Sequence, residues 1–344
     1  MRIAHITPLV AKRYINVASR RRTLFLRGAS GIGKSEVVFQ ASELLKQHVE
    51  GWQGVIDLRL AQMEPTDLRG IPFTKPGLTK GETRTGWARP DFLPQKGAGI
   101  LFLDELTSAP SSVQAAGYQL CLTPEDFGIP PEWMVVAAGN NKSDRGVTFN
   151  LAAPLQNRMC DITVTSSLDD FTEYAIGKVR PEVLSFLRDR PDYLHKFEPE
   201  KNGGVIAPFP SPRSWFAASA TLDLDLPQAD RVEVLAGDIG KEAAPAFEAH
   251  TRLYETMPRL DDILAGKDVE MPKDLSVRYC VAMGLASRLD VKNFDHAYKF
   301  IKQMPGEVQA LTVKLAFKRD RSITGAAKFA DWTIANQSAW KRTS

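Results

Sequence analysis

A glycine-rich segment near the start of the chain has the composition and spacing of a phosphate-binding loop. It reads GASGIGKS from Gly28 to Ser35 and matches the pattern GxxxxGK[ST]. Glycines let the backbone wrap phosphate oxygens with N–H groups, and a following helix directs its positive end at the same phosphates. Lys34 would reach the β- and γ-phosphates, and Ser35 would give its hydroxyl to Mg²⁺. The predicted nucleotide-binding residues are Gly28, Ala29, Ser30, Gly31, Ile32, Gly33, Lys34 and Ser35.

The surroundings of this segment argue against a chance match. From average residue frequencies, the four fixed positions would recur by accident in roughly one per cent of chains of this length. The apolar run TLFL precedes the loop at 23–26, and SEVVFQASELLKQ at 35–47 follows it with apolar residues at helical spacing. Strand, loop and helix is the context in which such a loop binds phosphate.

Two adjacent acids end a second apolar run, Ile100–Glu105, which reads ILFLDE. A strand buried on both faces has this composition, and ligands bind at the carboxyl ends of such strands. Asp104 would hold the Mg²⁺ shell, and Glu105 would orient and polarise the attacking water. Acids also favour helix N-caps, which is the structural alternative. The glycine-rich loop upstream favours the catalytic role of these two acids over helix capping.

A polar amide follows the next predicted strand, in the segment AAGNN. At this position Asn140 would lie near the γ-phosphate and the lytic water, with Asn141 as the fallback. The alternative is an asparagine-rich turn.

Three arginines are candidates for contacting nucleotide from a distance. Arg158, in LQNRMCDI, precedes a predicted strand and could reach a neighbouring subunit's γ-phosphate; Arg145 competes for that role. Arg213, in SPRSW, follows a proline at a predicted helix start and would approach the nucleotide from a second domain. A plain surface arginine is the alternative for Arg158.

The elements that position these residues alternate between strand and helix. Strands are predicted at 23–26, 54–60, 99–105, 133–140 and 160–165, with helices at 35–47 and 110–122. This order predicts an α/β fold in which helices cover both faces of a parallel five-stranded sheet.

The chain is predicted to contain three regions. Residues 1–166 form the nucleotide-binding domain, interrupted at 68–99 by an irregular segment rich in Gly, Pro, Lys and Arg. A connection of this length inside a compact domain is often functional. Residues 167–260 are predicted to form a helical domain and 261–344 a helical C-terminal region.

Composition excludes several classes of protein. Apolar residues make up 43% and charged residues 25% of the 344 residues, as in ordinary globular proteins. No apolar run reaches the roughly 18 residues of a membrane span, and the start lacks a secretory signal. The three cysteines are widely spaced, which argues against disulfides or a zinc site and predicts a cytoplasmic protein.

Taken in order, the motifs GASGIGKS, ILFLDE, AAGN, LQNRMCDI and SPRSW resemble those of AAA+ ATPases. The phrases LAQMEPTDLRGIP and ILFLDELTSAPSSVQAAGYQL are similar to the MoxR-like branch, and the resemblance spans about residues 20–260. It implies that Gly28–Ser35 is Walker A, Asp104 and Glu105 are Walker B, Asn140 is sensor 1, Arg158 is the arginine finger and Arg213 is sensor 2 on a helical lid.

The resemblance further implies an ATP-hydrolysing hexameric ring that uses ATP or ADP with Mg²⁺ and remodels partner proteins. A protein with a von Willebrand factor A domain is an implied partner, and the segment 68–99 matches an insert that projects toward the ring's pore. The alternatives are a DNA-acting AAA+ motor, and a nucleotide-gated scaffold or P-loop kinase. A net charge of +3 and only Arg20–Arg22 as a basic run favour a protein client over nucleic acid.

Overall fold

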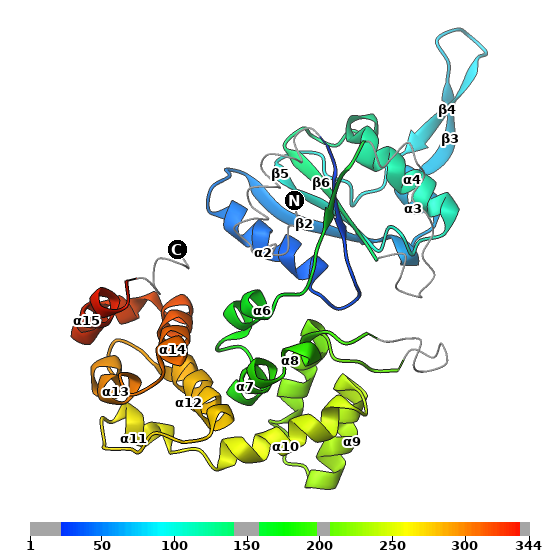
Figure 1. Ribbon diagram of the computed structural model, residues 1–344. Helices are drawn as coiled ribbons and strands as arrows, with labels where there is room; N and C mark the ends of the chain where they lie inside the picture. The colour runs from blue at the N-terminus through cyan, green and yellow to red at the C-terminus, as the bar shows by residue number, and fades with distance from the viewer. Residues whose placement is uncertain (1–21, 141–157, 198–206, 338–344) are drawn as a thin grey trace. The chain divides into compact units, whose positions relative to one another are not determined.

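Residues 22–140, 158–197 and 207–337 are described by the computed structural model. The chain divides into two units, Met1–Thr165 and Ser166–Ser344, and each is described by itself. The first is built on a five-stranded sheet and the second on helices (Figure 1).

All paired strands of the five-stranded sheet are parallel, in the order β2-β5-β6-β1-β7. Their bounds are β1 (Leu24–Arg27), β2 (Trp52–Arg59), β5 (Ala98–Asp104), β6 (Trp133–Gly139) and β7 (Cys160–Thr163). Strands β5 and β6 are buried along nearly their whole length, which explains their continuous apolar sequences. The predicted parallel five-stranded sheet is confirmed.

Helices cover both faces of this sheet (Figure 1). On one face α2 (Lys34–Lys46) shares an apolar cluster with Phe102 of β5. On the other, α3 (Pro65–Arg69) and α4 (Ser111–Leu122) share a cluster with Leu103, the next residue of the strand. Successive β5 side chains therefore enter opposite layers of a helix–sheet–helix sandwich, which was the predicted fold class.

The segment 68–99 contains regular structure that the sequence pattern did not reveal. After α3 the chain forms β3 (Ile71–Pro76) and β4 (Thr83–Ala88), an antiparallel pair separate from the main sheet. This hairpin extends away from the rest of its unit (Figure 1). Almost every residue in both strands is exposed, so no alternation of buried and polar positions marks them in the sequence.

The second unit is helical, as predicted. Its α-helices within the described ranges are α6 (Leu168–Ala175), α7 (Pro181–Asp189), α8 (Pro212–Thr221), α9 (Gln228–Ile239), α10 (Ala243–Glu255), α11 (Leu260–Leu264), α12 (Leu275–Arg288), α13 (Phe294–Ile301), α14 (Gly306–Arg319) and α15 (Ala327–Ala335). One cluster of buried apolar residues runs from Phe171 to Trp332. In the part of the chain that is described, no helix is both long and apolar enough to cross a membrane.

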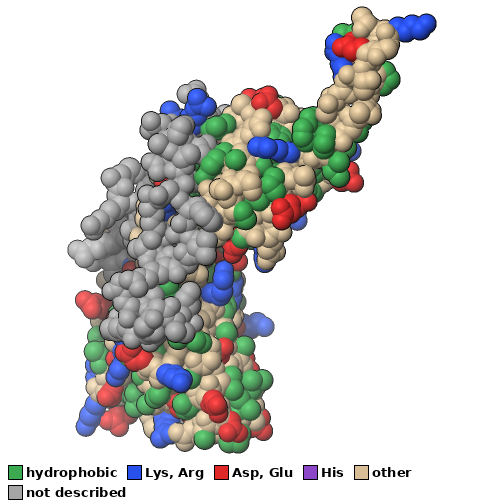
Figure 2. Space-filling view, turned by 90° about the vertical axis from the view of Figure 1, so that its right-hand side faces the viewer, with side chains coloured by type: hydrophobic (Ala, Val, Ile, Leu, Met, Phe, Trp, Pro, Cys, Tyr) green, Lys and Arg blue, Asp and Glu red, His purple; other side chains and the backbone are tan. Residues whose placement is uncertain are grey.

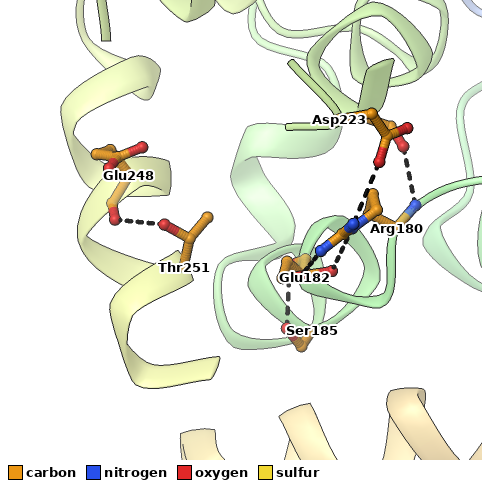
Figure 3. Close-up of polar contacts among 7 residues, drawn as sticks. Arg180, Glu182, Ser185, Asp223, Glu248 and Thr251 are labelled. Atoms are coloured by element: carbon orange, nitrogen blue, oxygen red, sulfur yellow. Dashed lines mark hydrogen bonds and ion pairs between the residues drawn. The ribbon is translucent and has the colours of Figure 1, made fainter. Parts of the chain in front are cut away.

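Arg180 joins two helices of the second unit through ion pairs (Figure 3). Its Nη2 lies 2.7 Å from Oε1 of Glu182 at the start of α7, and its Nη1 lies 3.1 Å from Oδ1 of Asp223, just after α8. The side chain of Glu182 is almost fully buried, so losing Arg180 would leave a buried carboxylate with reduced compensation.

A neutral histidine lies in the core of the same unit. His250 of α10 is 4% exposed, and its Nε2 lies 2.8 Å from Oγ of Ser185 on α7. The Ser185 hydroxyl also donates to the backbone oxygen of Glu182 at 3.0 Å, so the same side chain contacts both α7 and α10. Burial is the largest cause that lowers the pKa of His250 below its ordinary value.

Lowering the pH is expected to destabilise the second unit through His250. Its folded pKa lies below 6.5, so the unfolded chain binds a proton first as the pH falls. The stabilising contribution is complete above the unfolded pKa and is lost as the pH falls toward the folded pKa, with a slope of up to about 1.4 kcal/mol per pH unit. Urea unfolding between about pH 7.5 and 5.5 measures this. The His250→Gln variant should show a shallower dependence, and identical slopes would contradict this role.

Candidate nucleotide-binding site

The glycine-rich loop joins β1 to α2, as predicted. Gly31 and Gly33 have φ angles of 78° and 94°, in the left-handed region that glycine adopts without strain. Gly28 lies against the end of β7, where a Cβ would come within 2.7 Å of the carbonyl oxygen of Val164. The N-cap of α2 is Gly33, which has no side chain to cap the helix, and an uncapped helix start beside a glycine-rich loop is the kind of place where proteins bind phosphate.

Lys34 is buried at the start of α2 and is held by oxygens. Its ammonium donates to the backbone oxygens of Gly28 at 2.9 Å and Ala29 at 2.8 Å, and to Oδ1 of Asn140 at 3.0 Å. The side chain therefore folds back over the loop, where a phosphate held by the loop would meet its charge.

Ser35 and Asp104 bring the loop and the acidic strand end together. The Ser35 hydroxyl donates to Oδ2 of Asp104 at 2.7 Å, and Oδ1 accepts the N–H of Glu105 at 2.8 Å. A hydroxyl and a carboxylate are both hard oxygen donors of the kind that Mg²⁺ prefers. The residues present therefore fit the predicted magnesium site.

The protein alone supplies few ligands for such an ion. Within the described ranges, no three His, Cys, Asp or Glu side chains are grouped so as to hold a metal. Mg²⁺ commonly binds through one or two protein oxygens, with nucleotide phosphates and water completing the shell. Ser35 and Asp104 suit this mode, in which metal and nucleotide bind together.

Glu105 has an unusual backbone conformation. Its φ is 58°, the one positive value at a non-glycine position among the described residues, and its side chain is exposed. Such conformations are costly for glutamate and concentrate at functional sites. The helix-cap alternative for this acid is wrong, because α4 begins at Ser111 and its N-cap is Pro110.

Asn140 directly follows β6, which lies between β5 and β1 in the sheet. Its Oδ1 accepts from Lys34, and its backbone N–H donates to Oγ1 of Thr107 at 2.9 Å. Thr107 is buried in the loop after β5. No sequence pattern marks it as a site residue, and only its hydrogen bond with Asn140 connects it to the site. Asn141, the fallback, lies outside the described residues.

Asp57 belongs to the same edge of the sheet, although no sequence pattern marks it. It lies on β2 opposite Phe102, two residues before the position opposite Asp104. Its Oδ1 is buried and has no hydrogen-bond partner among the described residues, while Oδ2 lies 3.8 Å from Nε of Arg59. Burial first, and then the charge of Asp104, raises the pKa of Asp57.

Arg158 lies at the opposite edge of the sheet from its own phosphate-binding loop. It is exposed and just precedes β7, whose first residue, Cys160, pairs in parallel with Leu24 at the start of β1. The loop leaves the other end of β1, after Arg27. Four residues at about 3.3 Å each place roughly 13 Å of strand between the two edges. Arg158 is therefore not part of the constellation around Lys34, and its competitor Arg145 lies outside the described residues.

Arg213 belongs to the second unit. It is exposed and follows Pro212 at the start of α8, where Ser211 and Ser214 form a reciprocal capping box. The predicted helix start is therefore present. The sensor-2 role of Arg213 stays a prediction.

No protein-family profile and no curated protein sequence matches the chain. Several solved structures are similar to it. A candidate ATPase from Cytophaga hutchinsonii matches with 16% identity and a TM-score of 0.33 over 71% of this chain and 88% of that one. The Thermotoga maritima RuvB Holliday junction branch migration motor matches with 14% identity and a TM-score of 0.36 over 74% and 72%.

NtrX from Brucella abortus matches with 13% identity and a TM-score of 0.30, over 96% of this chain and 66% of that one. Likenesses of this degree are too remote to assign a family. The fold assignment rests on the parallel sheet order, its two helical layers and the geometry of the loop between β1 and α2.

Proposed function

We propose that the chain binds ATP with Mg²⁺ at the edge of its parallel sheet and hydrolyses it to ADP and phosphate. The observation that carries this proposal is the meeting of three separate motifs at one place. Lys34 contacts Asn140 across 106 residues of sequence, and Ser35 contacts Asp104 across 69. A chance match to the phosphate-binding pattern would not be expected to contact both Asn140 and Asp104, which follow or end two other strands of the sheet.

Each residue of the group has a distinct part in this proposal. The loop N–H groups and Lys34 bind and orient the phosphates, and Ser35 and Asp104 would hold Mg²⁺, which supplies charge neutralisation when bound. Glu105 is exposed next to Asp104 and would accept a proton from the attacking water. Asn140 is tied to Lys34 and Thr107, so its amide is positioned beside the phosphates.

Phosphate release from ATP by the purified chain tests the proposal. Release should require Mg²⁺ and should follow saturation kinetics in ATP. A chain that binds ATP but releases no phosphate, alone or with added protein or DNA, would be a nucleotide-gated scaffold.

We further propose that the chain works as an AAA+ ring of the MoxR-like type that remodels protein clients. The position of Arg158 supports assembly, because this arginine lies across roughly 13 Å of strand from its own loop and is exposed to a neighbouring copy. A hexamer, a partner with a von Willebrand factor A domain, and a pore-facing hairpin follow from the family resemblance alone. Stimulation of ATP turnover by DNA but not by protein would favour the DNA-acting alternative.

Mixing two inactive variants is expected to restore ATP turnover. Arg158→Ala should bind ATP and hydrolyse it poorly, while Lys34→Ala keeps its arginine but has no working loop. Where the two subunits meet in the right order, one site has both an intact loop and an arginine. An arginine in trans contributes on the order of 10³ in related phosphoryl transfers, so a few rebuilt sites exceed background. Phosphate release across a series of mixing ratios measures the recovery.

Co-assembly of the two variants is the control for this mixing experiment and is checked by sedimentation. Absence of recovery at every ratio, in proteins that do co-assemble, would show that Arg158 acts only within its own subunit or only structurally. Arg145 would then be the next residue to exchange.

A further inference from the structure

The two outer edges of the hairpin formed by residues 71–88 differ in their ability to accept another strand. The N–H of Gly77 donates to the backbone oxygen of Glu82 at 2.8 Å, next to the turn. Hydrogen-bonded pairs alternate in antiparallel strands, so the register makes 75–84, 73–86 and 71–88 the inner bonded pairs. The backbone groups of the residues between them face outward.

On β3 the outward positions are Pro72, Thr74 and Pro76. Proline has no N–H, so two of the three donors on that edge are missing, which is a common way to block strand pairing. On β4 the outward positions are Thr83, Thr85 and Trp87, all of which carry an N–H. These three N–H groups have no partner within the described ranges. The outer edge of β3 is therefore blocked against pairing with another strand, and the outer edge of β4 is open to it.

Large apolar side chains gather on the same hairpin. Four of them are exposed, namely Ile71 at 66%, Phe73 at 48%, Leu78 at 86% and Trp87 at 57%. In the described part of the first unit, Phe39 is the other large hydrophobic residue that is exposed. Ile71 and Phe73 lie on one face of the hairpin and Trp87 lies on the other, so both faces present exposed apolar side chains, as interaction surfaces do.

The charge on the hairpin is positive. Lys75, Lys80 and Arg84 face solvent, against one acid, Glu82. That acid is already engaged, because its carboxylate accepts from Arg84 and from the N–H groups of Leu78 and Thr79 in the turn. Figure 2 shows basic, acidic and hydrophobic side chains together toward the end of this projection.

We propose that the open edge of β4 binds an extended segment of a polypeptide partner as an added strand. Main-chain hydrogen bonds to the N–H and C=O groups of Thr83, Thr85 and Trp87 would hold it, as in other cases of strand addition. The inference rests on the proposed function only in taking a polypeptide as the partner.

The side chains on the two faces of the hairpin indicate which side chains the bound segment of the partner should carry. Alternation places the cross-strand pair Lys75 and Arg84 on one face, together with Ile71 and Phe73, and it places Trp87 with the uncharged Thr83 and Thr85 on the other. A strand added beside β4 therefore matches best when acidic side chains lie on the first face and apolar side chains on the second. The partner is an extended segment in which acidic and apolar residues alternate.

A cross-strand pair of threonines provides a matched test. Thr74 and Thr85 lie directly opposite each other, and both are exposed with outward N–H groups.

Binding of a labelled peptide of about eight alternating valine and glutamate residues is measured by fluorescence anisotropy. Thr85→Pro should weaken binding at least about tenfold, because it removes a central donor of the open edge. Thr74→Pro makes the same change on the blocked edge and should leave binding within about twofold.

A second test leaves the protein unchanged. The same peptide with alternate backbone nitrogens methylated should not bind, because it cannot pair along a strand. Equal effects of the two prolines, undiminished binding of the methylated peptide, or no peptide binding would each overturn the inference. Self-association lost in Thr85→Pro without peptide binding would make a second copy the occupant, and displacement by single-stranded DNA would make it nucleic acid. Either result would overturn it.

ATP turnover measured on the same proteins separates this inference from the proposed function. Normal turnover without peptide binding would overturn the strand-addition site alone. Peptide binding without turnover would overturn the ATPase proposal and leave this edge in place.

Discussion

Replacing Lys34 with alanine is expected to reduce ATP affinity by about 100-fold or more, because charge-assisted hydrogen bonds to phosphate contribute about 1.5–3 kcal/mol each. The buried ammonium is held by two loop carbonyl oxygens and by Asn140, so it is already positioned where the phosphates would lie. The substitution removes the positive charge and also leaves these oxygens without their donor. Titration with a fluorescent ATP analogue measures the loss.

Lys46 provides a matched control for this substitution. It lies in the last turn of the same helix, α2, and is exposed. Lys46→Ala removes an equal charge from the same element and should leave ATP affinity within about twofold, since surface changes away from a site are usually small. Thermal unfolding of both variants shows whether the loop still folds. Unchanged affinity in a folded Lys34→Ala protein would reject the phosphate-binding assignment.

Replacing Glu105 with glutamine is expected to preserve ATP binding and to lower turnover by a factor on the order of 10² or more, the range for a lost general base. Glutamine keeps the size and hydrogen-bonding shape of the side chain but cannot accept a proton from water. The contact between Asp104 and Ser35 does not involve the Glu105 side chain, so the proposed magnesium ligands should be unaffected. Single-turnover phosphate release, together with the nucleotide titration, separates the chemical step from binding.

Glu132→Gln is the matched control for the Glu105 variant. Glu132 is an exposed acid just before β6 in the same unit. Its substitution removes the same charge and should leave turnover near that of the unmodified protein. Near-normal turnover in Glu105→Gln would mean that its unusual backbone serves the turn and not the reaction.

The sandwich fold and the grouping of the candidate site residues could be predicted because their signals are local. A glycine-rich loop between an apolar run and a helical pattern is typical of phosphate binding, and β5 is apolar throughout because both of its faces are buried. Asn140 could be placed because the carboxyl ends of parallel strands meet at one edge of a sheet.

Other features depend on contacts that no local pattern encodes. Asp57 and Thr107 join the site through strand register and a single hydrogen bond. The positive φ of Glu105 runs against the preference of its own residue type. The strands of the hairpin were not predicted because both of their faces are exposed to solvent. Their sequences therefore lack the alternation of buried and exposed positions that marks a strand.

If Arg158 completes a neighbour's site as proposed, its separation from its own loop gives the assembly a direction. A contact between the amino edge of one sheet and the carboxyl edge of the next uses two different surfaces, so it is heterologous and repeats head to tail. An open row of n such copies has n − 1 completed junctions, with one arginine unused at one end and one unfinished site at the other. Closure into a ring is the arrangement that completes all n. Catalytic capacity per subunit would therefore report whether the row has closed.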